Sequence, residues 1–164
     1  MLRVRRIVEP IRVGQTLDSE FITVPGIVTG AAYADGDAIG TTIVFPNVLR
    51  PETLSGVLYS AHYNDLDDEG LQVDLVIFKG PPTYTPADNG AYAPTDADIR
   101  NRIAVISFAA FYNWSNNQSS DVANIGIGFA NAAGPHLYGH LIARGALNIA
   151  AANLPQVRLV VLAD

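Results

Sequence analysis

Short runs of β-branched and aromatic residues, separated by clusters of glycine, proline, asparagine and aspartate, recur along almost the whole chain. Such runs are typical of β-strands, and such clusters are typical of turns. Nine runs qualify as strands: Leu2–Val8, Glu20–Val24, Ala38–Phe45, Ser55–Tyr63, Leu71–Lys79, Arg102–Phe111, Ala123–Phe129, Leu137–Arg144 and Val157–Leu162. Because few helical stretches separate them, the pattern argues against βαβ units and predicts an all-β, mostly antiparallel sandwich or barrel.

Helices are expected in at most one or two short segments. Thr95 is followed three residues later by Asp98, which resembles a capping box, and only one or two helical turns fit before the next strand. The segment Gly145–Leu154 is compatible with either a short helix or a loop.

The clearest local feature is an expected hairpin with arms Val57–Tyr63 and Leu71–Phe78. Apolar and polar residues alternate at the start of the second arm, which is the period of a half-buried strand. Val76 and Phe78 break this alternation, so we expect that end of the strand to be covered on both faces. The acidic stretch Asp65–Gly70 between the arms is expected to form a solvated hairpin tip.

Two long connections stand out: Gly80–Thr95, which contains four prolines, and the polar segment Trp114–Val122. Connections of this length usually mediate contacts. Four aromatic residues in or next to them are candidate loop contacts: Tyr84, Tyr92, Tyr112 and Trp114. Their side chains are expected to pack the loops or contact other subunits, and the alternative is a platform for sugars.

The length of 164 residues is sufficient for one domain with a sizeable core. We predict a single β-domain over residues 21–164, preceded by residues 1–20 as an arm or a first strand. The chain contains no cysteine, so disulfides and thiolate zinc sites are excluded, as suits a reducing compartment.

No segment resembles a targeting or membrane-spanning sequence. Arginines interrupt Met1–Pro10, which therefore lacks the apolar region of a signal peptide. The uncharged stretch Ile103–Ser120 includes three asparagines and a glutamine and is too polar to span a bilayer. We expect a soluble protein without a membrane partner.

The formal net charge of −6 is unevenly distributed. Residues 1–12 carry four arginines against Glu9 alone, a net +3, so the remainder carries −9. Lys79 is the only lysine, and the body of the chain therefore lacks a basic surface that could neutralise a run of phosphates. Nucleic acid is not an expected partner.

Two groups of residues partly match metal-binding motifs, but each lacks a residue that its motif requires. Asp65–Gly70 begins like a calcium-binding loop, yet its twelfth position is Val76 and not a bidentate carboxylate. His136 and His140 lack an intervening glutamate, and on a strand they would lie about 13 Å apart. We expect them to be ordinary surface or interface histidines.

No nucleophile elbow, phosphate-binding loop or dinucleotide fingerprint occurs in the chain. Asp74 is the only acid within a clearly apolar strand, so no pair of facing carboxylates can be assigned. We therefore expect no enzymatic activity and no catalytic, cofactor-binding or metal-binding residues.

An ordered series of segments nevertheless resembles a known family. The series is Ala32–Gly40, Gly56–Tyr59, Asp74–Phe78, Asp88–Asp98, Leu137–Gly145 and Gln156–Leu159. In order and spacing it is similar to a group of tailed-phage virion proteins, over roughly residues 22–162.

The resemblance implies a jelly-roll-like β-domain that decorates or cements the outer shell of a phage head, commonly as a trimer. The implied partner is the major capsid protein. The implied location is the outer capsid surface of a virion assembled in the bacterial cytoplasm. The alternatives are a carbohydrate-binding β-sandwich module and a virion component associated with the tail or fibres.

Two expectations concern assembly. With 49% hydrophobic and only 16% charged residues, the chain has little charge to cover its outer faces, which favours a homotrimer. The N-terminal residues are candidates for an arm that contacts the capsid or a neighbouring copy by strand addition, the alternative being a first strand of the domain's own sheet. The candidate contact residues of this arm are Leu2, Arg3, Val4, Arg5, Arg6 and Arg12.

Overall fold

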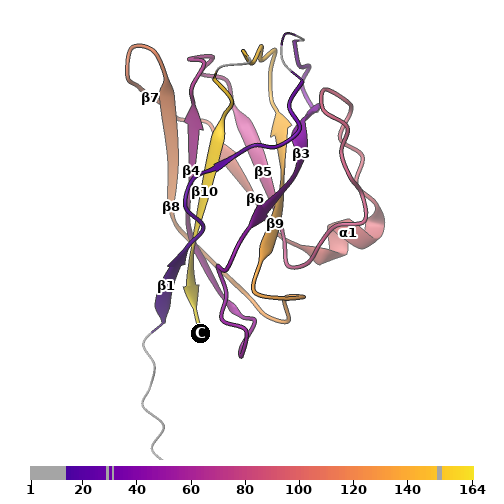
Figure 1. Ribbon diagram of the computed structural model, residues 1–164, viewed down its shortest axis with the longest axis vertical. Helices are drawn as coiled ribbons and strands as arrows, with labels where there is room; N and C mark the ends of the chain where they lie inside the picture. Colours follow the sequence, from indigo (N-terminus) through magenta and orange to yellow (C-terminus); the bar gives the residue numbers. More distant parts are fainter. Residues whose placement is uncertain (1–13, 29, 31, 151–152) are drawn as a thin grey trace, which may run out of the picture.

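The computed structural model describes residues 14–28, 30, 32–150 and 153–164, which form two antiparallel sheets packed face to face (Figure 1). The first sheet contains, in order, β1 (Gln15–Asp18), β10 (Gln156–Ala163), β4 (Gly56–Asp65), β8 (Gln118–Phe129) and β7 (Tyr112–Asn113), with β2 (Ile22–Thr23) also paired to β10. The second sheet contains β3 (Ala38–Phe45), β9 (Leu137–Ala143), β5 (Val73–Phe78) and β6 (Arg102–Phe108). The expectation of an all-β antiparallel sandwich is confirmed.

The order of the strands is that of a jelly roll. Strands β1 and β2 lie along the same edge of β10, and β7 is a short extension beside β8. The remaining strands interleave, because the chain changes sheet between β2 and β3, β3 and β4, β4 and β5, β6 and β7, β8 and β9, and β9 and β10. This arrangement of two four-stranded layers is the double Greek key of jelly-roll proteins.

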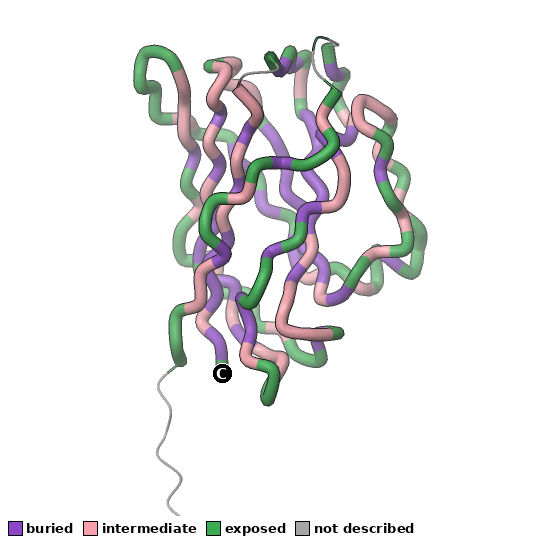
Figure 2. The backbone as a smooth tube through the Cα atoms, viewed as in Figure 1, coloured by how far each residue is buried: buried purple, intermediate pink, exposed green. Residues whose placement is uncertain are grey.

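The core lies between the sheets, and many residues of the strands that enclose it are buried (Figure 2). Its largest fully buried aromatic side chains are Tyr63, Phe45 and Phe108, and the rings of Tyr63 and Phe108 stack with their centroids 5.5 Å apart. All six residues of β5 are buried. The expectation that Val76 and Phe78 are covered on both sides is confirmed, because they form a second cluster with Ile142 on the outer face of the second sheet.

The expected hairpin between residues 57–63 and 71–78 is wrong. Its first arm belongs to β4, which pairs with β10 and β8, whereas its second arm belongs to β5, which pairs with β9 and β6. The acidic stretch Asp65–Gly70 therefore crosses from one sheet to the other. Alternation in residues 71–77 indicated which face of that strand points into the core, but it carries no information about the strand with which an edge pairs.

The observed boundaries of other strands also differ from the expected ones, in places where polar residues take part in strand pairing. Strand β8 begins at Gln118, inside the segment expected to be a loop, because Gln118–Ser120 pair with Tyr63–Asp65 of β4. Strands β1 and β7 were not expected. The expected short helix is confirmed as α1 (Asp96–Asn101), with Thr95 as its N-cap. The described residues of the segment 145–154 are not helical.

The chain between β5 and β6 folds back over the second sheet. Its residues Asn89–Ala91 lie along the free edge of β3: the Asn89 amide donates to the Ala38 carbonyl, and the Ala38 amide donates to the Gly90 carbonyl, both at 2.9 Å. An exposed strand edge offers unpaired backbone groups to other chains, so this segment protects the edge of β3.

Gly40 of β3 lies against residues 24–27 of the segment that precedes this strand, and its φ is +68°. A Cβ atom there would lie 2.3 Å from the Pro25 carbonyl oxygen. We expect Gly40→Ala to destabilise the fold by about 2–5 kcal/mol, because backbone strain and overpacking add. Urea unfolding provides the measurement.

Two alanine substitutions serve as matched controls. Gly36 also has a positive φ, of +91°, but open space around it, so Gly36→Ala should cost only the strain of about 1–2 kcal/mol. Gly134 has neither constraint, and Gly134→Ala should be close to neutral. Equal losses at positions 36 and 40 would show that the close approach to Pro25 does not matter.

Candidate functional site

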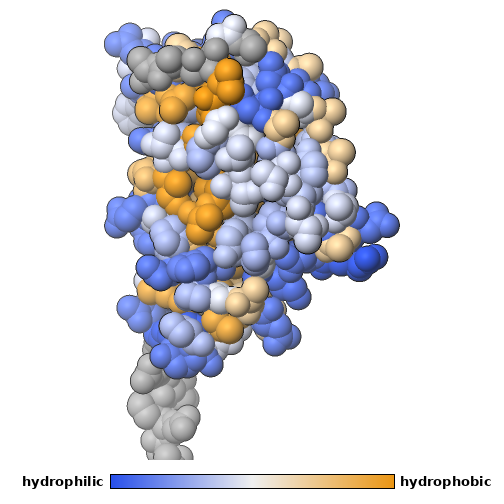
Figure 3. Space-filling view, turned by 45° about the vertical axis from the view of Figure 1, so that its right-hand side comes forward, coloured by the Kyte–Doolittle hydropathy of each residue, from blue (hydrophilic) through white to orange (hydrophobic). Residues whose placement is uncertain are grey.

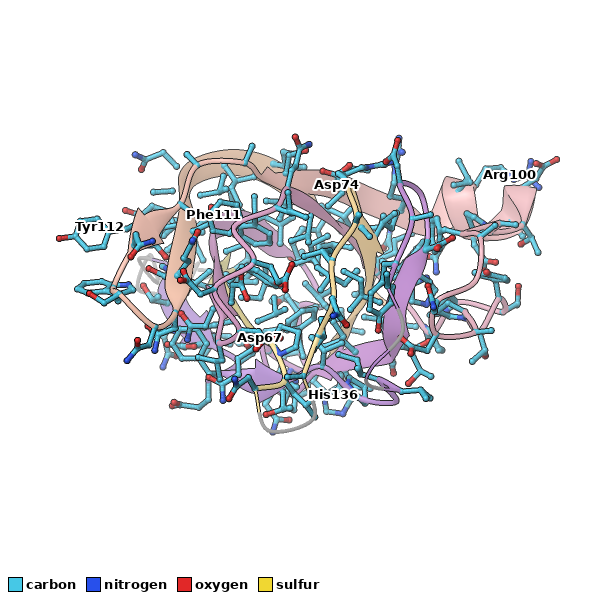
Figure 4. All side chains as sticks on the ribbon, turned by 90° about the horizontal axis from the view of Figure 1, so that it is seen from above. Asp67, Asp74, Arg100, Phe111, Tyr112 and His136 are labelled. Atoms are coloured by element: carbon cyan, nitrogen blue, oxygen red, sulfur yellow. The ribbon has the colours of Figure 1, made fainter. Side chains whose placement is uncertain are left out.

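The structure separates the four candidate loop aromatics into two pairs. Tyr84 and Tyr92 meet on the outer face of the second sheet, with ring centroids 5.6 Å apart, and both are half-buried. Tyr112 and Trp114 meet beside the β7–β8 turn with centroids 4.3 Å apart, and both are exposed. Figure 4 shows Tyr112 at one margin of the molecule and Arg100 of α1 at the opposite margin. The candidate arm residues at positions 2–6 and 12 lie outside the described residues.

The first pair packs around a buried histidine. The His140 ring is fully buried and lies within 6.0 Å of the ring centroids of Phe78, Tyr84 and Tyr92. Its Nδ1 shares a 3.0 Å hydrogen bond with the Tyr92 hydroxyl, and its Nε2 shares one of 3.0 Å with the Thr42 hydroxyl. Both ring nitrogens are therefore engaged, and the ring links β9 to β3 and to the covering segment.

The expectation of two ordinary surface or interface histidines is wrong for His140. The segment over the second sheet covers it, and this burial lowers the pKa of His140 to about 4, although the nearby Asp98 carboxylate opposes the shift. His136 is half-buried, and its Nδ1 accepts a 3.0 Å hydrogen bond from the Asn47 amide. The two histidines have different partners and do not form a common site.

Asp98 organises the segment that carries Tyr84 and Tyr92. Its carboxylate accepts hydrogen bonds from the amides of Thr83, Tyr84 and Thr95 and from the hydroxyls of Thr83 and Thr95, at 2.7–3.2 Å. Burial raises the pKa of Asp98, but the bonds from Thr95 and Thr83 outweigh it and lower the pKa to about 2. The helix cap and the loop therefore share one charged acceptor.

Asp88 fixes the other end of this segment. Its carboxylate accepts hydrogen bonds from the Val28 amide at 2.7 Å, the Tyr33 hydroxyl at 2.7 Å and the Gly40 amide at 2.6 Å. Burial and the bond to Asp88 raise the pKa of Tyr33 well above its ordinary value. The long proline-rich connection is therefore held to the sandwich at both ends.

The acidic stretch uses its carboxylates as structural acceptors. Asp65 is buried and accepts from the amides of Asp67 and Gly70, at 3.1 and 2.8 Å. Asp67 accepts from the Ala150 amide at 2.7 Å and from the Asn153 side chain at 3.1 Å. Among the described residues, no group of three or more His, Cys, Asp or Glu side chains is arranged to hold a metal ion.

Asp74 is bound on the outer face of β5. It accepts hydrogen bonds from the Ser107 hydroxyl at 2.5 Å and from the Arg144 Nε at 2.7 Å. Although burial raises its pKa, these two partners lower the pKa of Asp74 below its usual range. The carboxylate stays ionised and joins β5 to β6 and to the end of β9.

The exposed pair, Tyr112 and Trp114, is held by the turn that connects β7 and β8. The Trp114 amide donates to the Asn117 carbonyl at 2.9 Å, and the indole Nε1 donates to the Ser119 hydroxyl at 3.0 Å. The two ring planes are inclined by 50°. This side-chain pair, together with residues 112–118, is called the aromatic tip below.

Sequence reasoning found the aromatic residues but missed the groups that hold them. No local signal marked Asp88 or His140 as organising residues, because their partners lie about 50 or more positions away for Asp88 and nearly 100 positions away for the Thr42 contact of His140. The Thr95–Asp98 pattern did carry a signal, since it is a local capping motif.

Comparison of the chain with models of known protein families and with curated proteins found no match. Within the described residues no helix has the length and apolar character required to cross a membrane.

Replacing His140 tests the buried cluster by its pH dependence. The unfolded chain binds a proton at this residue below about pH 6.5, whereas the folded protein binds it only below about 4. His140 therefore removes stability as the pH falls from about 6.5 to 4, by up to about 3 kcal/mol. His140→Gln should unfold more easily at pH 7 but lose this part of the acid sensitivity, as measured by urea unfolding between pH 7 and 4.

Val76→Ala is the matched control, because it loosens the same cluster and keeps the imidazole. It should lower stability at every pH and keep the wild-type pH dependence. An unchanged pH dependence in His140→Gln contradicts the assignment of the shifted proton to this residue.

Proposed function

We propose that this chain is a structural protein of a tailed-phage virion, a decoration or cement protein that binds the outer capsid surface and stabilises contacts between major-capsid subunits. The series of segments from Ala32 to Leu159 that resembles virion proteins supports this proposal. The jelly-roll order of the strands is compatible with it, since this architecture occurs in viral capsid proteins. A fold by itself does not assign a function, which depends on the residues that the surface presents to a partner.

The observation that carries the proposal is the rigid attachment of the long connections to the sandwich. Asp98 and Asp88 hold the segment between β5 and β6, and Asp68 holds the aromatic tip through the Gln118 side chain at 2.7 Å. A surface that is ordered before binding loses little conformational entropy when it meets a partner. This property suits a protein that must match a repeated shell surface.

The polar groups of the interior support a structural role over a catalytic one. Among the described residues, no buried side-chain nitrogen or oxygen lacks a hydrogen-bond partner. The carboxylates of Asp74 and Asp98 and the imidazole of His140 are each committed to contacts between elements. The proposal therefore includes no reaction and no cofactor.

Stabilisation of a capsid follows from mass action. A protein that binds the assembled shell but not its separated subunits stabilises the shell by RT ln(1 + [L]/Kd) per site, about 2.7 kcal/mol at a hundredfold excess over Kd. Many identical sites multiply the effect. The proposed site of synthesis is the host cytoplasm, and the proposed final location is the outside of the head.

The proposed assembly state is a homotrimer. Figure 3 shows apolar side chains gathered in a broken band on one face, with hydrophilic side chains on either side. Large apolar residues are also exposed on the strands, among them Val44, Tyr59 and Val105, at 42–44%. Apolar surface of this kind is commonly covered by contacts between subunits.

Mixing the purified chain with undecorated heads and with isolated tails of the parent phage tests the proposal. We expect saturable binding to heads, with a fixed number of copies per particle, and no binding to tails. Heads that already carry the chain are the control and should take up no more. Binding to tails alone points to the tail-associated alternative, and binding to neither particle overturns the proposal.

A carbohydrate-binding module is the second candidate, favoured by the exposed Tyr112 and Trp114 side chains. Their 50° inclination counts against it, because the two rings do not form one flat platform for a sugar ring. A glycan array should show no binding above background. A binder that is lost with Trp114→Ala and retained with Tyr59→Ala would establish this alternative.

A further inference from the structure

The aromatic tip is the most exposed aromatic surface among the described residues. Tyr112 is 63% exposed and Trp114 is 59% exposed, although both belong to a turn that is held by several hydrogen bonds. Exposed aromatic side chains on a rigid support are typical of the anchors that dominate binding energy in protein interfaces. The tip is therefore a candidate contact for a partner chain.

The surroundings of the tip are negatively charged. Asp68 accepts hydrogen bonds from the side chains of Gln118 at 2.7 Å and Asn113 at 3.5 Å, which ties the acidic stretch to the tip. None of the four ion pairs between described residues involves the acids at positions 65–69. Burial raises the pKa of Glu69, a backbone hydrogen bond from Asn148 opposes this shift, and the nearby negative charges of Asp67 and Asp65 raise the pKa further.

The tip and the first described residue lie at opposite ends of the sandwich (Figure 1). Gln15 of β1 pairs with Ala163, which pairs in turn with Gly56 at the start of β4. Asp65 at the other end of β4 pairs with Gln118, beside the tip. The ten residues of β4 therefore separate the two ends by about 30 Å.

Residues 1–13 have the complementary chemistry. They combine four arginines and one acid with Leu2, Val4, Ile7 and other apolar residues. Guanidinium groups bind carboxylates and also stack on aromatic rings, most strongly on tryptophan. An extended segment of this length reaches at most about 43 Å, which is sufficient to meet a neighbouring molecule.

We propose that the aromatic tip binds residues 2–12 of a second copy of this chain. The segment supplies guanidinium groups that complement the acidic stretch and the Trp114 ring, and apolar side chains that complement Tyr112. The contact is heterologous, because one end of a copy binds the opposite end of the next, and such contacts close into rings when the rotation permits. The inference goes beyond the proposed function and requires no capsid, so either can fail without the other.

Two full-length variants provide the main test. Trp114→Ala removes the receiving side chain, and the triple variant Arg3→Glu, Arg5→Glu, Arg6→Glu reverses the charge of the donating segment. We expect each alone to raise the dissociation constant for self-association at least about tenfold, as measured by analytical ultracentrifugation. Wild-type association should also weaken with added salt, because its charge pairs are screened.

An equimolar mixture of the two variants should restore association, since one variant retains the donating segment and the other retains the tip. Such mixtures should stop at pairs, because each complex has only one intact contact. Ile99→Ala, which shortens an exposed apolar side chain on α1, is the control and should associate like wild type. A monomeric wild-type chain, undiminished association of either variant, or a mixture that remains monomeric overturns the proposal.

Direct binding can be followed through Trp114, the only tryptophan of the chain. A synthetic peptide of residues 1–13, added to the triple arginine variant, should change the Trp114 emission and saturate. The same peptide with glutamine in place of its arginines should bind at least about tenfold more weakly. A tryptophan emission that does not respond to the first peptide contradicts the proposal even if the substitutions perturb the fold.

Discussion

Burial of β5 on both faces is the constraint on which the rest of the structure depends. Its inward side chains, such as Leu75 and Ile77, pack in the core, while Val76 and Phe78 face away from it. Apolar side chains on an outer face contribute to the stability of the fold only when they are shielded from water. Another part of the chain must therefore pack over them. The connection between β5 and β6 fulfils this role, and for that reason it is long, rich in proline and tightly bound.

The way in which that connection is held explains several polar residues at once. Asp98 gathers five donors at the helix cap, Asp88 joins the connection to the crossing segment before β3, and His140 links Tyr92 to Thr42 beneath it. A buried charge or imidazole is tolerated only when its hydrogen bonds are satisfied. These groups therefore hold the connection in place over the second sheet. The shifted pKa values of Asp98 and His140 follow from their positions beneath it.

The two outer faces of the sandwich consequently differ in how far other parts of the chain cover them. The outer face of the second sheet is partly closed by the connection, whereas the first sheet ends in an exposed aromatic turn beside an acidic crossing segment. Strand β8 continues along the edge next to that turn, and its positive φ angles at Asn124 and Gly126 accompany an irregular pairing with β4. Irregularity of this kind discourages strand addition along an edge.

The sequence by itself determined the all-β class, most of the long strands, the inward face of the segment 71–77 and the short helix α1 with its cap. These depend on neighbours in the chain: the period of two in Val73–Ile77, the break at Val76 and the Thr95–Asp98 spacing are all local. Only the tertiary structure decided which strands pair, and for that reason the expected β4–β5 hairpin was wrong. It also decided that Tyr84 and Tyr92 are half-buried while Tyr112 and Trp114 are exposed, because the partners that cover a side chain come from distant parts of the chain, and no local pattern encodes them.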